Sequence, residues 1–122
     1  MTMTWRRTAR VGGVILTVAV LAACSTPAPA KRARPLVGVT LLPETHLFYK
    51  AMEDALRAEA AVKNMDLAIV SCEMDPAKQA SQFEDFVTQK VDAILAAPCD
   101  SNAVVSYVQA ATTAGIPVFT AD

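Results

Sequence analysis

Five side chains that could contact a small molecule stand near the ends of predicted strands. Glu44 and His46 follow the first predicted strand, Phe48 and Tyr49 come just after them, and Asp122 follows the last strand. An aromatic ring can cover the C–H face of a small ring, and a carboxylate can accept two hydroxyl protons. These residue types therefore predict binding of a small polar ligand. Glu44 and His46 are the weaker candidates, because both fit exposed loop positions.

Phe48 has a second interpretation, since it begins an apolar stripe on the helix predicted from His46 to Lys63. The further members of the predicted stripe are Met52, Ala55, Glu59 and Val62. Residues with this spacing share one face of a helix. Phe48 is thus a core candidate as well as a ligand candidate, whereas Tyr49 lies off the stripe and is the better ligand candidate. Asp122 has the alternative interpretation of a solvated turn acid.

The common catalytic motifs are absent from the sequence. The segment 42–46 after the first strand contains no glycine, so it holds neither a GxGxxG fingerprint nor a phosphate loop. There is no GxSxG elbow, and His46 has no nucleophile at a convincing spacing. No CxxC or Cys/His spacing indicates a metal site. The sequence predicts a protein that is not an enzyme and uses no cofactor or metal; an enzyme on a flavodoxin-like sheet is the less favoured class.

The elements that must position these residues alternate between apolar runs and helical periods. Strands are predicted at 36–42, 66–72, 93–97 and 117–120, and helices at 46–63, 75–90 and 100–115. Asp75 and Pro76 are a typical N-cap and first helical residue, Asp100 or Ser101 caps the third helix, and Gly115 ends it.

This order predicts the α/β class, with an open doubly wound parallel sheet of the form β-α-β-α-β-α-β. The second strand is expected on one side of the first, and the third and fourth on the other. In such sheets ligands bind at the carboxyl ends of the strands. The sequence stops at Asp122 without a helix to cover the last strand, which predicts a truncated piece of a longer protein.

Cys72 and Cys99 each follow a predicted strand, and the first strand is expected to lie between them. Two strand spacings amount to roughly 9 to 10 Å. A disulfide needs Cα atoms within about 7 Å. The sequence therefore favours two small buried residues over a disulfide.

Charge is distributed unevenly along the chain. Residues 1–35 contain six basic and no acidic residues, whereas residues 36–122 contain five basic and twelve acidic ones, a net charge of 5 − 12 = −7. A body this acidic repels the phosphates of nucleic acids, and no basic stripe offsets the repulsion. Nucleic acid is therefore excluded as an expected partner.

Residues 1–23 have the parts of a secretory signal peptide. A basic start is followed by an apolar run from Val11 to Ala23, which is too short for a stable membrane span. The residues Leu21-Ala22-Ala23-Cys24 resemble a bacterial lipobox, in which the cysteine is acylated. Cleavage without acylation of Cys24, and a retained anchor, are the alternatives. Residues 24–35, rich in proline, predict a flexible tether, and the fold is expected to occupy 36–122.

Four stretches of the body carry a resemblance to a known family. They are LFYKAMEDALRAEA, DPAKQASQFEDFVTQKVDAIL, APCDSNAV and AGIPVFTAD. The chain resembles the N-terminal lobe of the type I periplasmic binding proteins, especially the ribose-binding-like sugar receptors of ABC importers. In these receptors paired aromatics enclose the sugar ring and an aspartate after the fourth strand binds its hydroxyls, which carries over to Phe48, Tyr49 and Asp122.

The resemblance implies an exported protein of the periplasm or cell surface, anchored to the membrane by a lipid on Cys24. It would bind a small polar ligand, with a sugar preferred, and pass it to an ABC permease by closure of two lobes. Leu42 and Ala97 depart from polar residues that are common in the family, so a sugar other than ribose, a polyol or a furanose fits as well. The alternative is a receptor of the same fold that signals to a chemoreceptor or sensor kinase.

Overall fold

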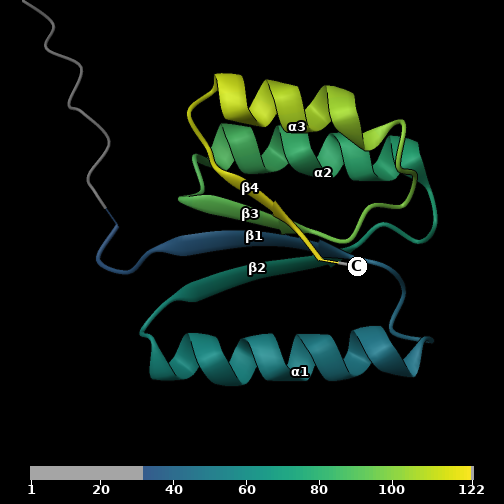
Figure 1. Cartoon of the computed structure of the whole chain (residues 1–122). Coiled ribbons are helices and arrows are strands. Elements are labelled where there is room, and N and C mark those ends of the chain that lie inside the picture. Colours follow the sequence, from purple (N-terminus) through teal and green to yellow (C-terminus); the bar gives the residue numbers. More distant parts are fainter. Residues whose placement is uncertain (1–31, 122) are drawn as a thin grey trace, which may run out of the picture. The chain divides into compact units, whose positions relative to one another are not determined.

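The computed structural model describes residues 32–121, and the structural statements below concern this part of the chain. It contains a parallel sheet with helices on both faces (Figure 1). The elements in chain order are β1 (Leu36–Leu41), α1 (Leu47–Val62), β2 (Asp66–Ser71), α2 (Pro76–Gln89), β3 (Ala93–Ala96), α3 (Val104–Thr113) and β4 (Val118–Thr120).

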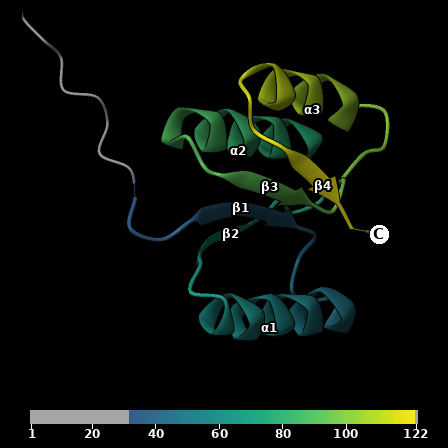
Figure 2. The same ribbon diagram turned by 60° about the vertical axis from the view of Figure 1, so that its left-hand side comes forward.

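The strand order confirms the predicted topology. All strands are parallel in the order β2-β1-β3-β4, and Val39 of β1 is paired with Ile69 on one side and with Leu95 on the other. The chain moves from β1 to β2 in one direction and from β2 through β3 to β4 in the other. Right-handed crossovers therefore place α1 on one face of the sheet and α2 and α3 on the other (Figures 1 and 2).

The core consists of two apolar clusters, one on each face of the sheet. The cluster beneath α2 and α3 contains Phe83, Phe86, Val91, Ile94, Ala96, Ala111 and Ile116. The cluster beneath α1 contains Val39, Leu41, Tyr49 and Ala97. Alternate residues of each strand face opposite clusters, which explains why the strands are apolar along most of their length.

The predicted start of α2 is confirmed, but its end differs. The Asp75 carboxylate accepts hydrogen bonds from the backbone amides of Ala77 and Lys78, at 2.8 and 3.3 Å. Lys90, predicted as the last residue of the helix, is instead the exposed C-cap, with a left-handed backbone (φ 53°). The reversal of chain direction needed to enter β3 begins at Lys90, so its side chain leaves the face of the helix.

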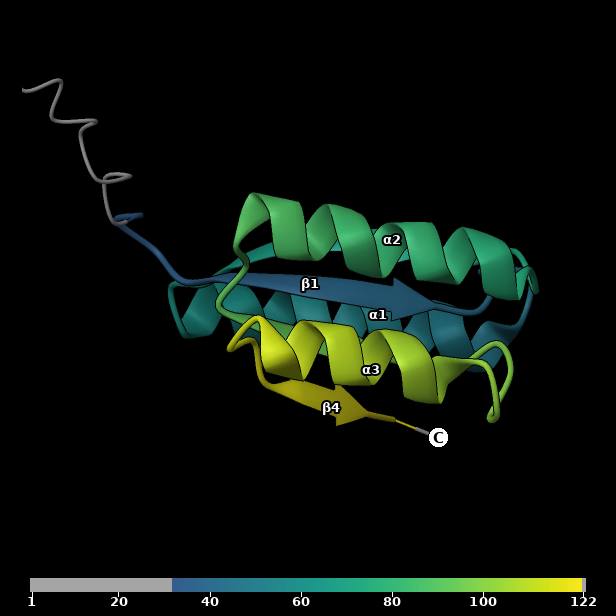
Figure 3. The ribbon, with the colours of Figure 1, turned by 90° about the horizontal axis from the view of Figure 1, so that it is seen from above.

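The α3 helix begins later than predicted, at Val104, and its N-cap is Ala103 rather than Asp100 or Ser101. Asp100 accepts hydrogen bonds from the amides of Asn102 and Ala103, so its carboxylate caps the turn that leads into the helix. Val104 and Ala111 are the buried residues of this helix. Gly115 has φ +82°, a conformation that other residues rarely adopt, and it ends the helix (Figure 3 shows α3 beside α2).

The predicted buried stripe of α1 is wrong. Phe48 and Val62 are 58% and 81% exposed, while Tyr49 and Ala60 are buried and Leu56 is half-buried. The helix carries apolar residues on two faces, and spacing alone does not tell which face meets the sheet. The sheet accepts the face with Tyr49 because that ring packs against Val39 and Ala97 of the core.

The contacts of the folded part extend back to Arg32. Its guanidinium donates hydrogen bonds to the carbonyls of Gln89 and Lys90 at the end of α2. The guanidinium of Arg34 donates to the Met65 carbonyl at 2.8 Å and lies 3.3 Å from the Asp66 carboxylate. Arg32 and Arg34 lie in the segment predicted as a tether, but their side chains bind the edge of the sheet where the strands begin.

Candidate functional site

A cavity lies at the carboxyl ends of the strands, where the topology predicts a ligand site. Its volume is about 240 Å³, and its lining residues come from α1, the loop after β3 and the segment after β4. They are Tyr49, Ala97, Pro98, Ser101 and Ala121. We call this the strand-end cavity. Segments far apart in the sequence thus meet at one edge of the sheet.

Tyr49 is the predicted ligand residue that lines this cavity. Its side chain is 9% exposed, and its ring meets that of Phe48 edge to face with centroids 5.1 Å apart. Phe48 is exposed and does not line the cavity, so the core interpretation of Phe48 is wrong. The two rings stand at 83° to each other. They therefore do not form two parallel walls around an empty slot.

The other predicted residues lie at the margin of the cavity or outside the described part. Glu44 and His46 are exposed and do not line the cavity, although the His46 ring lies 6.1 Å from the Tyr49 ring. Asp122 and Cys24 fall outside the described residues. Ala121, the neighbour of Asp122, lines the cavity and its amide donates to the Ala96 carbonyl at 3.0 Å.

Ser101 is a candidate that the sequence analysis did not select. It lines the cavity with Pro98 and is exposed, so its hydroxyl is available to a ligand. Its position after a strand that ends in a buried alanine run is the signal that could have identified it. The turn that carries Ser101 is held by the neighbouring Asp100 carboxylate.

Cys72 and Cys99 form a disulfide, with Cα atoms 6.7 Å apart, so the prediction of two unpaired cysteines is wrong. That prediction used the spacing between the strands themselves. Both cysteines stand beyond the last paired residues of β2 and β3, where the chain has already left the sheet. The two loops converge over the end of β1, and the amide of Cys72 donates to the Leu41 carbonyl there.

Gln79 is a buried polar residue beneath the same loop. Its side-chain amide is fully buried, and the Oε1 atom accepts a hydrogen bond from the Cys99 amide at 3.0 Å. The Nε2 atom donates to the Ala97 carbonyl at 2.9 Å and to the Thr40 hydroxyl at 3.3 Å. Burial of an amide is tolerated when its donors and acceptor are satisfied, as they are here.

Gln82 continues this set of contacts one helical turn later. Its Oε1 atom accepts a hydrogen bond from the Thr40 hydroxyl, with 2.7 Å between the two oxygens, and its Nε2 atom donates to the Ser71 carbonyl at 2.8 Å. Residues 79, 82, 83 and 86 recur at helical spacing, so burial of Gln79 beside Phe83 could have been predicted from the sequence. The identity of its partners depends on how the loops fold.

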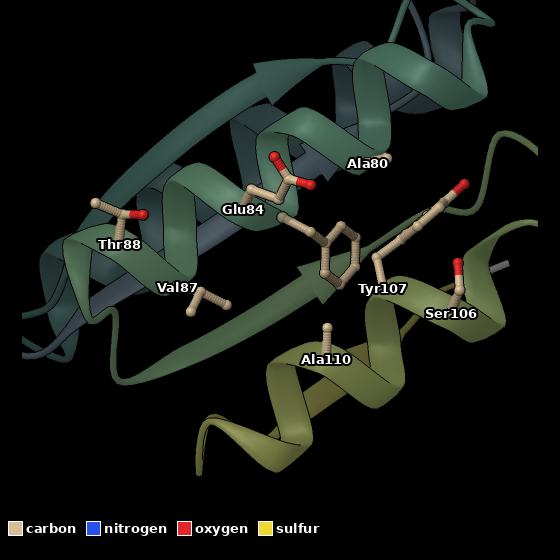
Figure 4. Close-up of a pocket in the computed structure, with 8 residues that line it drawn as sticks. Ala80, Glu84, Val87, Thr88, Ser106, Tyr107 and Ala110 are labelled. Carbon is tan, nitrogen blue, oxygen red and sulfur yellow. The ribbon is translucent and has the colours of Figure 1, made fainter.

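A second, larger cavity lies between α2 and α3, on the face away from α1 (Figure 4). Its volume is about 480 Å³, and its lining residues are Ala80, Phe83, Glu84, Val87, Thr88, Ser106, Tyr107 and Ala110. We regard the smaller strand-end cavity as the candidate site. The larger cavity between α2 and α3 is mainly apolar, and its polar groups lie along its rims rather than converging on one point.

The pKa is shifted at Tyr107 and at Lys50. Burial, with a smaller contribution from Asp100, raises the pKa of the Tyr107 hydroxyl. The Lys50 ammonium, near the start of α1, bonds to the Asp54 carboxylate, which raises its pKa, and the charges of Glu44 and Glu53 act in the same direction. Neither residue lines the strand-end cavity. The arrangement therefore suits binding of a neutral polar molecule.

Residues 32–121 contain neither a cluster of metal ligands nor a helix that could cross a membrane. No group of three or more His, Cys, Asp and Glu side chains there could hold a metal ion. Within the same residues, no helix combines the length and apolar character needed to cross a bilayer.

Comparison with known proteins gives a consistent result. A family model described as a periplasmic binding protein domain matches residues 37–122. A ribose import binding protein of Bacillus subtilis is 33% identical, and the match covers 89% of this chain but 39% of that protein. The ribose import binding protein of Escherichia coli is 30% identical, with 93% of this chain and 37% of that protein covered.

Solved structures give the same picture. An ABC transporter solute-binding protein of Bacillus halodurans with bound myo-inositol superimposes with a TM-score of 0.69 at 29% identity. That match covers 76% of this chain and 32% of the other. A relative from Actinobacillus succinogenes with bound D-allose gives a TM-score of 0.70 at 26% identity, covering 73% and 32%. This chain thus spans well under half the length of these relatives.

Proposed function

Because this chain belongs to the periplasmic binding protein domain family, we propose that it acts in an extracytoplasmic solute-binding protein that delivers a sugar or cyclic polyol to an ABC importer. Members of this family are substrate-binding proteins and not enzymes. The importer role and the class of ligand are inferred from relatives that bind ribose, myo-inositol and D-allose.

The observation that carries this proposal is the strand-end cavity with Tyr49 in its wall. The Tyr49 ring offers an apolar face, and the hydroxyl of the exposed Ser101 can exchange hydrogen bonds with ligand hydroxyls. These groups are uncharged, which suits a neutral ligand with many hydroxyls. A cyclic polyol presents both an apolar ring face and a rim of hydroxyls, so it matches this mixture of contacts.

We assign the remaining candidates to the rim of the same site. Phe48 is proposed to cover the ligand from the exposed side, and Asp122 to accept hydrogen bonds from two ligand hydroxyls. His46 and Glu44 are proposed as outer contacts. Because the chain spans about 39% of its relative from Bacillus subtilis, binding by two lobes that close over the ligand is part of the proposal for the whole protein.

The test of ligand binding is a titration of the chain with myo-inositol and with D-allose, followed by amide NMR. We expect saturable shifts of the Ser101 and Ala121 amides at millimolar ligand, and no shifts with succinate at the same ionic strength. Phe48→Ala is expected to weaken binding several-fold. The matched control is Phe119→Ala, because Phe119 is 59% exposed, like Phe48, but lies in β4, whereas the Phe48 ring contacts the Tyr49 ring in the wall of the cavity. Equal effects of the two variants, or shifts spread over the surface, would contradict the assignment.

Export and anchoring form a separate part of the proposal. We propose that residues 1–23 are removed and that Cys24 is acylated, so that residues 24–35 tether the fold to the membrane. Metabolic labelling with a palmitate analogue is expected to modify the wild type and not Cys24→Ala. A labelled Cys24→Ala variant, or an unlabelled wild type that is still exported, would refute acylation at Cys24.

A further inference from the structure

The end of β2 and the loop after β3 are joined by two independent bridges that run side by side. One is the covalent bond between Cys72 and Cys99. The other is the set of hydrogen bonds that runs from the Ser71 carbonyl through Gln82, Thr40 and Gln79 to the Cys99 amide. Both bridges end at Cys99, and they begin at neighbouring residues, Ser71 at the end of β2 and Cys72 just after it. This duplication needs an explanation, because either bridge alone would restrain the loop.

The hydrogen-bonded bridge is closed at every step. The Thr40 hydroxyl donates to Gln82 Oε1 and accepts from Gln79 Nε2. The Gln79 Oε1 atom accepts a hydrogen bond from the Cys99 amide, and the second hydrogen on Nε2 is donated to the Ala97 carbonyl. Thr40, Gln79 and Cys72 are each 0% exposed. Water therefore offers no alternative partner, and a displaced loop would leave buried groups unsatisfied.

The loop that receives both bridges is part of the strand-end cavity. Ala97 and Cys99, which Gln79 holds, flank Pro98, and Ala97 and Pro98 line the cavity. Ser101 follows two residues after Cys99 and lines the same cavity. Gln79 does not line it. It therefore acts on the wall of the site only through the backbone of the loop.

We propose that Gln79 is a positioning residue of the strand-end cavity and that it works together with the Cys72–Cys99 disulfide as one clamp on residues 97–101. Gln79 fixes the loop from beneath, and the disulfide fixes it to the end of β2. Each bridge holds the loop where the other can form, so the two stabilise each other. The clamp proposal rests on the proposed function only where it treats the strand-end cavity as a ligand site.

Mutual stabilisation gives a quantitative test that needs no ligand. The full chain is equilibrated with glutathione, so that one glutathione disulfide is reduced to two glutathione thiols for each Cys72–Cys99 bond formed. After the thiols are trapped, trypsin places Cys24, Cys72 and Cys99 on separate peptides, because Lys31, Lys63, Lys78 and Lys90 lie between or beside them. Mass spectrometry then gives the equilibrium constant of this one bond.

Gln79→Leu is expected to lower that equilibrium constant about tenfold, since the loop loses a hydrogen bond to the Cys99 amide. The control is Gln89→Leu, the same substitution at an exposed position of the same helix, which should leave the constant unchanged. Gln79→Glu should also lower the constant, because an ionised carboxylate cannot donate to the Ala97 carbonyl. Acidification should partly restore the constant, because a protonated carboxyl can donate there again. A folded Gln79→Leu chain with a constant within twofold of the wild type would overturn the clamp.

The reciprocal measurement uses the wild type and does not depend on the folding of a variant. Coupling between two bridges is equal in both directions. Reduction of the disulfide should therefore speed hydrogen exchange of the Cys99 amide through local opening of the loop by the same factor, about tenfold. Unchanged exchange at Cys99 would overturn the proposal.

Failure of ligand binding remains distinguishable from failure of the clamp. If the wild type binds myo-inositol, its reduction should weaken binding, and Gln79→Leu should do the same. If the wild type binds neither myo-inositol nor D-allose, the ligand assignment fails while the glutathione equilibrium still decides the clamp.

Discussion

Gly38 shows how one residue sets the distance between a helix and the sheet. It lies in the middle of β1, and a Cβ atom added there would stand 2.7 Å from the Phe86 ring. Phe86 is almost fully buried in the cluster beneath α2 and α3. The absence of a side chain at Gly38 is therefore what allows the ring to lie against the strand.

Gly38→Ala is accordingly expected to lower the free energy of unfolding by about 1 to 3 kcal/mol, through overpacking against Phe86. The measurement is urea unfolding followed by circular dichroism. Phe86→Leu makes room at the same place, so Gly38→Ala should cost less in that background than in the wild type. Additive losses in the double variant would show that the Phe86 contact is not the cause.

Ionisation of the Tyr107 hydroxyl should lower the stability of the folded state. Burial raises the pKa of its hydroxyl in the folded state above the ordinary value of 10.0, and the hydroxyl lies 3.4 Å from the Pro76 carbonyl. The folded state therefore holds this proton more tightly than the unfolded state. Its contribution to stability is fully present below pH 10 and is lost as the pH rises through the raised pKa.

Urea midpoints measured from pH 8 to pH 11 should therefore fall more steeply for the wild type than for Tyr107→Phe at the alkaline end. Tyr49→Phe is not a suitable control, because Tyr49 lines the candidate site. Tyr107→Phe retains one tyrosine, Tyr49, so the difference between its absorbance change on ionisation and that of the wild type reports Tyr107. Parallel curves for the wild type and Tyr107→Phe would refute this coupling.

The start of α2 is where local sequence and tertiary position coincide. Asp75 satisfies two of the amide groups that the first turn leaves without partners, and Pro76 has no amide hydrogen to satisfy. The same helix carries Gln79 and Gln82, so its starting point determines where both amides lie beneath the loops.

Asp75→Ala is expected to destabilise the chain by about 1 kcal/mol, whereas Asp75→Ser should lose less because a serine hydroxyl can still cap. Thermal unfolding monitored by circular dichroism measures both. Asp85→Ala is the control, an exposed aspartate in the same helix away from its first turn. A loss for Asp85→Ala as large as that for Asp75→Ala would contradict capping as the source of the effect.

The disulfide acts on the whole molecule because it closes a long loop. Cys72 and Cys99 are 27 residues apart, and the loop between them contains α2 and β3. A crosslink over this length restricts the unfolded chain and stabilises the folded state by about 3 kcal/mol in the entropic account.

Replacing both residues, Cys72→Ala with Cys99→Ala, is therefore expected to lower the free energy of unfolding by about 3 kcal/mol. Urea unfolding with and without a phosphine reductant tests the cause. The reductant should destabilise the wild type and leave the double variant unchanged. Equal sensitivity of both proteins to the reductant would show that this bond is not responsible.

The sequence by itself determined the class of the fold, the strand order and the edge at which the candidate site lies. Those features follow from local patterns: apolar runs, the capping pair Asp75 and Pro76, and the turn at Gly115. The strand order then follows from the handedness of crossovers, which is nearly invariant. Family membership was also visible in the sequence, because the matched segments span the whole body of the chain.

Only the tertiary structure decided which face of α1 is buried, how the loops meet and which residues share the cavity. The helix has two apolar faces, and only packing against the sheet decided that Tyr49 is buried and Phe48 exposed. The disulfide was misjudged because strand spacing says nothing about loops that leave the sheet. Gln79 hydrogen-bonds to Ala97 and Cys99, which lie 18 and 20 residues later in the chain. No local sequence pattern encodes such contacts, because they form only when packing brings the segments together.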